Sequence, residues 1–248
     1  MPKLLTTAAL KGGVGKSVLT ANLAAGLAKA GQKVLLINLD GQNDSLRMLN
    51  AEASWDKTFY DLIKKGRASV SDCRISLMDG VDAIASGSTM EIDVIIAQSK
   101  KDADELLSSI LPEDEVSEYD FILFDLGPGE RYINSIILKT AKIIYPVQCE
   151  FESIKSLENM NKYLAQLGLS SDDIKLVVPN MLNKSKNTSK MTYQTIKALF
   201  PDNKVTKPIP TRADISSAAA FGVNIFDYTT KDEIITPFMD FIMKAIKL

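Results

Sequence analysis

Short apolar runs alternate with longer amphipathic segments along the chain. Two of these runs, Val34 to Ile37 and Phe121 to Phe124, are continuously apolar, which is typical of strands buried on both faces of a parallel sheet. The alternation predicts an α/β fold, with a mostly parallel sheet and helices on both of its faces. We expect seven strands, at Leu4 to Leu10, Lys33 to Leu39, Val81 to Ala85, Phe121 to Asp125, Ile143 to Val147, Lys175 to Val178 and Val205 to Ile209.

The first expected helix has the clearest pattern. Leu19, Leu23 and Leu27 recur at every fourth position, and Gly31 follows as a stop signal. Since the sequence shows no internal repeat, low-complexity tract or long linker, we expect residues 1–248 to form a single domain. Further helices are expected at Asp102 to Leu111, Ile154 to Leu167, Thr188 to Phe200 and Lys231 to the C-terminus.

The composition excludes several kinds of site. The 248 residues carry a formal net charge of −2, so any nucleic-acid binding would need a local basic patch. Histidine is absent, which excludes an imidazole base, a Ser-His dyad and a histidine metal site. Cys73 and Cys149 lack metal-ligand spacing and indicate two reduced thiols. With no signal peptide and no run of about 18 apolar residues, we expect a cytoplasmic protein.

A glycine-rich loop separates the first expected strand from the first expected helix. Glycines allow backbone N–H groups to converge on an anion, and the helix N-terminus adds partial positive charge. Lys16 is expected to reach the β- and γ-phosphates of ATP, and the Ser17 hydroxyl to ligate Mg²⁺. The alternative is a glycine-rich turn without a ligand. The expected cofactor-binding residues here are Lys11, Gly12, Gly13, Val14, Gly15, Lys16, Ser17 and Val18.

This loop departs from the common GxxxxGK[ST] pattern at its first position. Leu10 stands in register with the usual first glycine, and Lys11 opens the loop instead. The KGGxGK[ST] form is the deviant Walker A motif, and through it the sequence resembles the ParA/MinD family of P-loop ATPases. The resemblance implies that Lys11 reaches across a dimer interface to the ATP of the partner subunit. Judged without the family, Lys11 is equally well interpreted as a solvated loop lysine.

A second motif closes the next buried strand. The segment 38–42, Asn-Leu-Asp-Gly-Gln, resembles the family's Walker A′ segment, usually written VDxDPQ. The resemblance implies that Asp40 helps to position the attacking water and the magnesium shell. Asn38 replaces the usual Asp and Gly41 the usual Pro, which puts the rate of hydrolysis in question more than nucleotide binding. As an alternative, Asp40 is only a helix N-cap or a turn residue.

The third motif is an apolar strand that ends in a carboxylate, followed by Gly127 and Pro128. This is the Walker B pattern, and it places Asp125 at the carboxyl edge of the sheet beside the phosphate-binding loop. There Asp125 would accept a hydrogen bond from Mg²⁺-bound water or from Ser17. The residues after it resemble the family's switch loop, which senses the γ-phosphate.

Two later positions match the family's base-binding segments. Asn180 ends an expected strand, and the resemblance implies that its amide reads the adenine ring. The segment that contains Pro210 resembles the family's I-P-R segment, which lies near the base. Asn180 as an ordinary turn residue is the alternative.

A local basic excess lies between residues 184 and 212, where seven basic residues accompany one acid, Asp202. Such an excess suggests a face for phosphate backbones. In ParA-type members the ATP-bound dimer binds DNA through such a surface without sequence preference. The alternative is a solvated helix face. The tentative DNA-binding residues are Lys184, Lys186, Lys190, Lys207 and Arg212.

The C-terminal segment bears on another branch of the family. MinD-type members bind membranes through a C-terminal amphipathic helix with a basic face. The segment 236–248 has only two lysines, and Asp240 interrupts it. We therefore expect this helix to dock onto the sheet, and membrane binding is not the expected role.

The sequence thus predicts an ATPase in which Lys11, Lys16, Asp40 and Asp125 carry the chemistry, and Ser17, Asp40 and Asp125 surround Mg²⁺. The resemblance implies a nucleoid-associated homodimer that forms on ATP, binds non-specific DNA, and is stimulated by a centromere-binding or adaptor protein. Its task would be plasmid or chromosome partition, or cargo positioning. We also expect no N-terminal helix-turn-helix domain. A MinD-like membrane-associated regulator of cell division and a non-hydrolysing nucleotide-binding module are the alternatives.

Overall fold

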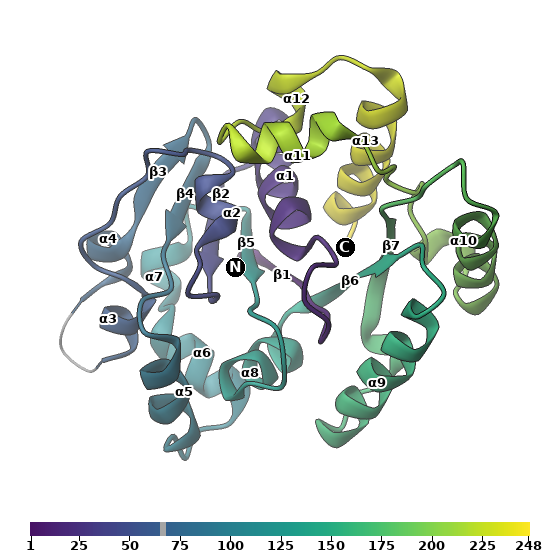
Figure 1. The fold of residues 1–248 in the computed structure, drawn as a ribbon. Coiled ribbons are helices and arrows are strands. Elements are labelled where there is room, and N and C mark those ends of the chain that lie inside the picture. Colours follow the sequence, from purple (N-terminus) through teal and green to yellow (C-terminus); the bar gives the residue numbers. More distant parts are fainter. Residues whose placement is uncertain (65–67) are drawn as a thin grey trace.

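A seven-stranded sheet runs through the computed structural model, which describes residues 1–64 and 68–248 (Figure 1). The strand order is β3-β4-β2-β5-β1-β6-β7, and every pairing is parallel except the one between β3 and β4. The expected fold class is therefore confirmed. The strands are β1 (Lys3–Thr7), β2 (Val34–Asn38), β3 (Ile75–Met78), β4 (Val81–Ile84), β5 (Phe121–Asp125), β6 (Lys142–Gln148) and β7 (Ile174–Asn180).

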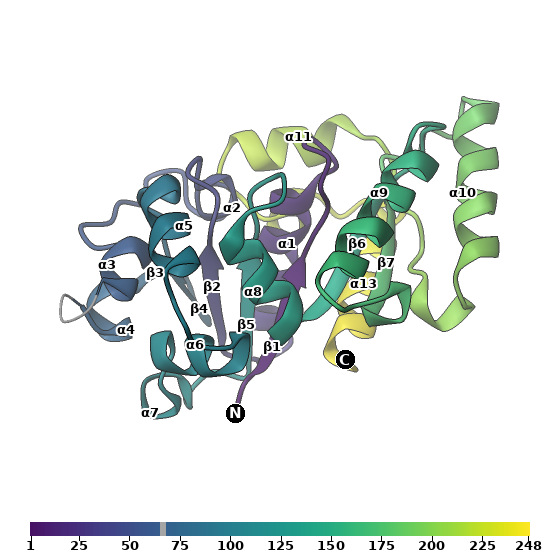
Figure 2. The same cartoon turned by 90° about the horizontal axis from the view of Figure 1, so that it is seen from below.

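Helices cover both faces of this sheet, as Figure 1 shows, with α1 and α13 on one face and α5, α6, α8 and α9 on the other. Helix α10 lies at the far end of the sheet, beyond β7 (Figure 2). The helices are α1 (Lys16–Lys29), α2 (Asp44–Arg47), α3 (Phe59–Ile63), α4 (Val70–Cys73), α5 (Thr89–Ala97), α6 (Ala103–Ile110), α7 (Glu113–Val116), α8 (Tyr132–Thr140), α9 (Ser153–Gln166), α10 (Asn187–Leu199), α11 (Ala213–Ala220), α12 (Ile225–Tyr228) and α13 (Asp232–Ile246), with 3-10 turns at Ser171–Asp173 and Asp202–Lys204.

The central strands bury alternate side chains in two separate cores. Leu36 and Leu123 pack on the side of α1 and α13, whereas Ile37 and Phe124 pack on the side of α8 and α9. Side chains of successive strand residues point to opposite faces, so a strand covered on both sides must be apolar at every position. This explains why the runs in β2 and β5 are continuously apolar.

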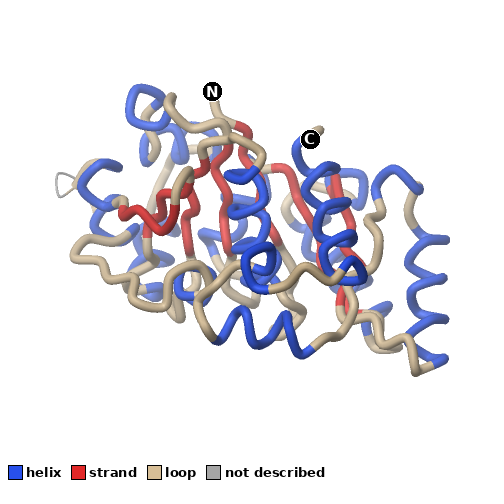
Figure 3. The backbone as a smooth tube through the Cα atoms, turned by 90° about the horizontal axis from the view of Figure 1, so that it is seen from above, coloured by secondary structure: helices blue, strands red, loops and turns tan. Residues whose placement is uncertain are grey.

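The C-terminal helix α13 is docked, as expected from its sequence. Its apolar stripe is buried against α1 and the sheet, and Phe238 and Phe241 are both fully enclosed. The last turn lies at the edge of the sheet where β1 begins (Figure 3), and there the Lys3 side chain donates a hydrogen bond to the carbonyl of Ile246. In the part of the chain that the structure describes, no helix is both long and apolar enough to cross a bilayer.

The expected strand Val205 to Ile209 is wrong. Only two backbone hydrogen bonds join this segment to β7, from Thr206 N to the Val177 carbonyl and from Ile209 N to the Pro179 carbonyl. Pro208 and Pro210 lack an N–H group, and a segment with proline at alternate positions cannot continue a ladder.

Other differences concern elements that the pattern did not reveal. Strand β3 and helices α5 and α8 were not expected, and β1 ends at Thr7 rather than Leu10 because the chain turns there into the glycine-rich loop. Both α5 and α8 border the functional site, so the site contains contacts that the sequence pattern did not predict. The remaining expected strands and helices are confirmed to within about two residues at each end.

Candidate functional site

The glycine-rich loop and the two motifs that contain Asp40 and Asp125 converge at one edge of the sheet. Strands β2, β5 and β1 are parallel neighbours, and their last residues, Asn38, Asp125 and Thr7, lie in register. Because parallel strands present their carboxyl ends together, ligands of such sheets bind at this edge. The glycine-rich loop leaves β1 here and enters α1 at Lys16. The structure thus brings Lys16, Asp40 and Asp125 into one site.

The glycine-rich loop requires glycine at two positions because of its backbone conformation. Gly13 has φ 72° and Gly15 has φ 92°, values in the left-handed region that side chains disfavour. A Cβ atom on Gly15 would also lie 2.3 Å from Nδ2 of Asn180. That Nδ2 donates a 2.8 Å hydrogen bond to the carbonyl of Val14. Asn180, the last residue of β7, therefore holds the glycine-rich loop in place. Its position at the end of a strand did not reveal this role in the sequence.

Lys16 is a buried cation, with only 7% of the residue exposed. Burial lowers the pKa of its ammonium group, and the carboxylates of Asp125 and Asp40 oppose this shift. The Nζ atom makes a long, 3.4 Å contact with the carbonyl of Lys11. A desolvated ammonium group with such a weak neutral partner favours binding of an additional anion, and phosphate oxygens supply that charge.

Asp125 is fully buried at the end of β5. Its Oδ2 accepts a 3.2 Å hydrogen bond from Asn38 Nδ2, and its Oδ1 has no hydrogen-bond partner among the described residues. Burial raises the pKa of this carboxyl to about 6, although Ser45, Ser17 and Lys16 act in the opposite direction. An unpartnered buried oxygen beside a serine hydroxyl fits the hydration shell of Mg²⁺.

The ligand set also matches Mg²⁺ rather than a metal held by protein alone. Residues 1–64 and 68–248 contain no group of three or more His, Cys, Asp or Glu side chains that could hold a metal ion. Mg²⁺ is usually bound through one or two carboxylates, several waters and the phosphates of a nucleotide. The Ser17 hydroxyl and the Asp125 carboxylate would contribute the protein's part of that shell.

Asp40 lies in the turn that follows β2. Its Oδ1 accepts a 3.2 Å hydrogen bond from the backbone N–H of Gln42, while its own N–H donates a 2.7 Å bond to Asn38 Oδ1. The N-cap of the next helix, α2, is Asn43, so the interpretation of Asp40 as a helix N-cap is wrong. Asp40 does help to close the turn, and its side chain is partly exposed beside Lys16.

A cavity of about 250 Å³ adjoins the glycine-rich loop on the side of β7. Gly15, Val18, Asn180, Met181 and Pro210 are among its lining residues. Asn180 uses one N–H for Val14 and one oxygen lone pair for the Met181 N–H, so its amide retains one donor and one acceptor position. Two of the residues expected near the base therefore line the same cavity. The adenine-reading role of Asn180 stays a prediction.

Comparison with known protein families and sequences gives two results in agreement. A protein-family model described as an AAA domain matches residues 2–178. The chromosome partitioning protein ParA of Caulobacter vibrioides is 25% identical over 236 residues, which cover 92% of this chain and 88% of that protein. The chain belongs to the ParA/MinD family of P-loop ATPases.

Two solved structures show the same fold. A putative plasmid partition protein from Borrelia burgdorferi, bound to AMPPNP, superposes with a TM-score of 0.80 and 24% identity, and the match covers 100% of this chain and 99% of that one. The septum site-determining protein MinD of Pyrococcus horikoshii, complexed with Mg-ADP, gives a TM-score of 0.74 at 19% identity, with 99% and 96% covered. Both branches of the ParA/MinD family therefore share this architecture.

Asn38 is the point at which this ParA/MinD family member departs most from the usual Walker A′ segment. The side chain is fully buried, and its Nδ2 donates to Ser45 Oγ at 2.7 Å as well as to Asp125. An ionised aspartate cannot donate a hydrogen bond and would add a second buried negative charge beside Asp125. The amide thus holds the carboxylate in place without repelling it. Ser45 was not among the residues singled out in the sequence.

The opening lysine of the deviant Walker A motif contacts residues of its own chain. Lys11 Nζ donates a 3.2 Å hydrogen bond to Gln148 Oε1 and lies 4.0 Å from a carboxylate oxygen of Glu152. Gln148 Nε2 in turn donates to the carbonyl of Gly13 at 3.0 Å. Gln148 therefore supports the phosphate-binding loop. In the sequence, its position at the end of a strand was the one feature that could have indicated this role. Action of Lys11 on a partner subunit stays a prediction.

The tentative DNA-binding residues occupy two environments. Four of them have no ion-pair partner in the described part of the chain, namely Lys184, Lys186, Lys190 and Lys207. Arg212 is different, since its guanidinium donates two 2.8 Å hydrogen bonds to Glu233. Lys184 and Lys207 line a surface hollow together with Asp232 and Glu233. The surface is thus less purely basic than the sequence count indicates, and its lysines are better candidates than Arg212.

The raised pKa of Asp125 predicts a pH-dependent effect of Asp125→Asn. The folded-state pKa of about 6 exceeds the ordinary value of 3.8, so the charged carboxylate destabilises the fold above pH 6 and this cost disappears as the pH falls toward 4. A shift of about two pKa units corresponds to about 3 kcal/mol. In nucleotide-free protein with EDTA, we expect Asp125→Asn to raise the free energy of unfolding at pH 8 by up to that amount.

Urea unfolding at pH 4.5 and pH 8 measures this effect. The gain from Asp125→Asn should shrink at the lower pH, because the wild-type carboxyl is then largely protonated, and therefore uncharged, in the folded state. Asp172→Asn, in an exposed 3-10 turn, serves as the control and should have only a small effect on the free energy of unfolding at both pH values. A gain of equal size at both pH values would contradict the raised pKa.

Proposed function

We propose that this ParA-type protein is an ATP-hydrolysing switch that dimerises on ATP and binds DNA without sequence preference. The observation that carries the proposal is the buried Lys16 cation, placed between the glycine-rich loop and two carboxylates at the carboxyl edge of the sheet. The relatives named above as partition proteins support the biological setting, which is partition of a plasmid or chromosome, or positioning of another cargo.

Each residue of the site has one task in this proposal. Lys16 and the backbone N–H groups of the glycine-rich loop bind the β- and γ-phosphates, and the helix N-terminus of α1 adds its partial charge. Ser17 and Asp125 orient the Mg²⁺ shell, and the metal offsets negative charge on the phosphates. Asp40 orients the attacking water. We expect a low rate of hydrolysis without a partner protein, because Asp40 lies in a turn and is partly exposed to solvent.

Lys11 supplies the link between nucleotide and dimerisation. Within the described residues, its ammonium group makes two weak contacts, one with Gln148 and one with the exposed Glu152. We propose that it leaves these partners and pairs with the phosphates bound by the second subunit. A charge-assisted hydrogen bond to phosphate is stronger than a hydrogen bond to a neutral amide, so the exchange favours the ATP-bound dimer. We therefore propose a nucleoid-associated cytoplasmic protein that alternates between dimer and monomer.

DNA is the proposed partner of the dimer because four lysines have no ion pair among the described residues. Three of them are exposed on α10 or just before it, Lys184, Lys186 and Lys190, and Lys207 is exposed at the same surface hollow as Lys184. Lysines contact phosphates without reading bases. The MinD-like alternative finds less support, since α13 buries its apolar stripe within the fold. A centromere-binding or adaptor protein that stimulates hydrolysis remains part of the proposal.

Lys11→Ala tests the link between nucleotide and DNA. The variant should bind ATP as a monomer with near wild-type affinity, because Lys16 and the loop are intact. Its ATP-dependent dimerisation should weaken by about 30-fold or more, as expected when one partner of a desolvated charge pair is removed. Co-sedimentation with DNA in the presence of ATP and Mg²⁺ should fall in parallel. Analytical ultracentrifugation and a fluorescent ATP analogue measure the first two quantities.

The matched control is Lys139→Ala, which removes an exposed lysine in the last turn of α8. It should leave dimerisation and DNA binding unchanged. Anionic liposomes replace DNA in a second arm of the experiment. ATP-dependent binding of the wild-type protein to liposomes but not to DNA would reject the proposed function in favour of the MinD-like one. An equal loss of ATP affinity in Lys11→Ala and Lys16→Ala would contradict the trans role of Lys11.

A further inference from the structure

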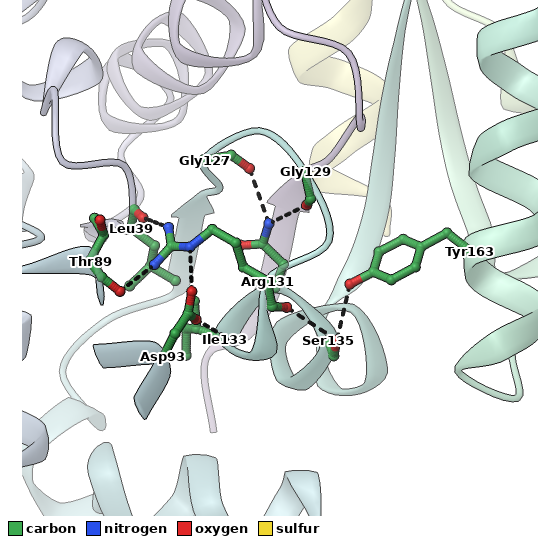
Figure 4. Close-up of polar contacts among 10 residues, drawn as sticks. Leu39, Thr89, Asp93, Gly127, Gly129, Arg131, Ile133, Ser135 and Tyr163 are labelled. Carbon is green, nitrogen blue, oxygen red and sulfur yellow. Dashed lines mark hydrogen bonds and ion pairs between the residues drawn. The ribbon is translucent and has the colours of Figure 1, made fainter. Parts of the chain in front are cut away.

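The peptide unit that joins Leu39 to Asp40 is held from both sides by side chains. Figure 4 shows one of these sides, where Arg131 contacts Leu39. Its N–H donates a 2.7 Å hydrogen bond to Asn38 Oδ1, and its carbonyl oxygen accepts a 2.6 Å bond from Nη1 of Arg131. This peptide immediately precedes the Cα atom of Asp40, so its orientation determines where the Asp40 carboxylate points. Asn38 is the last residue of β2 and Arg131 is the N-cap residue of α8, so two distant parts of the chain act on the same peptide.

All three guanidinium nitrogens of Arg131 donate hydrogen bonds here. Besides the Leu39 carbonyl, Nη2 donates to the Thr89 carbonyl at 3.1 Å and Nε donates to Asp93 Oδ2 at 2.9 Å. The side chain is only 17% exposed, so these bonds form largely away from water. The planar guanidinium places its donors on three separate nitrogens and so holds three acceptors that lie apart, whereas the donors of a lysine all sit on one nitrogen. The loop after β2 is thereby bound to the start of α5.

The same contacts extend to the loop that follows Asp125. Arg131 is the N-cap residue of α8, and Asp93 Oδ1 accepts a 3.1 Å hydrogen bond from the backbone N–H of Ile133. Asn134 Nδ2 donates to the carbonyls of Gly127 and Gly129, at 3.1 and 3.0 Å. Figure 4 shows these bonds as one connected group. A displacement of the loop at 126–130 therefore shifts Arg131 and, through it, the Leu39 carbonyl.

We infer that Arg131 is a positioning residue for ATP hydrolysis, which couples the loop after Asp125 to the orientation of Asp40. This inference rests on the proposed function, in which Asp40 orients the attacking water. Arg131 acts through the Leu39 carbonyl and need not touch the nucleotide. A change in the loop beside the γ-phosphate thus reaches Asp40 without any contact between the two carboxylates.

A purely structural role for Arg131, tying α5 to α8, leads to different expectations. Loss of such a tie would lower stability and would affect nucleotide binding and hydrolysis together. Loss of a positioning contact would leave binding intact and lower only kcat, because misaligned catalytic groups weaken the transition state and not the ground state. The two roles are therefore separable by comparing kcat with KM.

The test is Arg131→Lys, assayed for ATP hydrolysis with DNA present. Lysine keeps the positive charge beside Asp93 but cannot hold all three acceptors. We expect kcat to fall on the order of 10- to 100-fold, with KM and ADP affinity within about twofold of wild type. Arg74→Lys is the matched control, since Arg74 also joins several partners, Glu118, Tyr119 and Asp82, at a distance from the site. Its kcat should not change.

Two further measurements make the inference specific to Asp40. In an Asp40→Ala background, Arg131→Lys should cause no additional loss of kcat, because the residue it positions is already gone. Hydrogen exchange of the peptide that spans residues 39–43 should become faster in Arg131→Lys without nucleotide, since the Asp40 N–H is less well held. In Asp93→Asn, the amide oxygen can keep the bond from the Ile133 N–H, but the amide nitrogen cannot accept from Arg131 Nε. This variant should lower kcat in the same direction and covers the case in which Arg131→Lys does not fold.

Several outcomes would overturn the inference. Unchanged kcat in Arg131→Lys, a rise of KM in step with the fall of kcat, or a full multiplicative loss in the Asp40→Ala background would each show that Arg131 does not act through Asp40. These results all require a wild-type protein that hydrolyses ATP. If the wild-type protein has no ATPase activity with DNA and Mg²⁺, the proposed function fails first and the inference with it.

Discussion

Lys16→Ala should abolish measurable ATP binding by the monomer and lower hydrolysis by about 1000-fold or more, the larger end of the effect of removing one preorganised electrostatic contact. The reason is the position of its ammonium group, which is buried between the glycine-rich loop and the carboxylates of Asp40 and Asp125. Without the cation, the γ-phosphate would face these two carboxylates across a desolvated site. Isothermal titration with ATP and Mg²⁺, together with a phosphate-release assay, measures both effects.

Lys29→Ala provides the comparison on the same helix. Lys29 lies in the last turn of α1 and pairs with Asp227 at the surface, where an ion pair contributes at most about 1 kcal/mol to stability. Its loss should leave ATP binding unchanged. Thermal unfolding without nucleotide should show that Lys16→Ala is folded, and the variant gains stability if anything, because it removes a buried charge. ATP binding by Lys16→Ala within tenfold of wild type would refute the assignment of this loop.

The phosphate-binding part of the site was predictable from the sequence because it depends on local features. Gly15, Lys16 and Ser17 are adjacent in the chain, and the strand before them and the helix after them both have clear apolar patterns. Asp125 was predictable for the same reason, since a carboxylate at the end of a buried strand lies at the edge of the sheet. These residues lie where a parallel sheet presents the ends of its strands, and the structure confirms their convergence.

The residues that hold the site in place were not predictable in this way. Arg131 and Gln148 act through partners about 90 and 135 positions away along the chain, and no periodicity in the sequence reports such contacts. Helix α8 was missed because its nine residues follow a loop with two glycines and a proline, which gave no continuous helical pattern. The false strand at Val205 to Ile209 shows the opposite error, since the β-branched residues Val205, Thr206 and Ile209 outweighed Pro208 between them.

Asn38 illustrates a third kind of limit. The sequence showed only that an expected carboxylate was missing, which cast doubt on hydrolysis. The structure shows the amide donating to Asp125 and Ser45 and accepting from the Asp40 N–H. The two donated bonds require an amide, because an ionised carboxylate has no donor, whereas a carboxylate oxygen could also accept the third. The replacement therefore has a structural reason of its own, and hydrolysis through Asp40 remains compatible with it.

Gly15→Ala should damage the site more than any other single methyl group added to the glycine-rich loop. At φ 92° an alanine is strained, and its Cβ would lie 2.3 Å from Asn180 Nδ2, so the bond from Asn180 to the Val14 carbonyl must break. Left-handed backbone costs about 1–2 kcal/mol for a residue with a side chain, and a broken buried hydrogen bond costs about 1–3 kcal/mol more. We expect the free energy of unfolding to fall by about 3 kcal/mol.

Gly168→Ala separates the two contributions to this loss. Gly168 has φ 78°, but no atom lies within 4 Å of the position of its Cβ, and it is remote from the site at the end of α9. Alanine at position 168 should lower the free energy of unfolding only by the cost of the left-handed backbone, and it should leave ATP affinity unchanged. Gly15→Ala should also lose most of its ATP affinity, because the displaced Val14 carbonyl changes the direction of the loop N–H groups. Equal destabilisation by the two variants, with ATP affinity intact in both, would show that Asn180 does not hold the phosphate-binding loop in place.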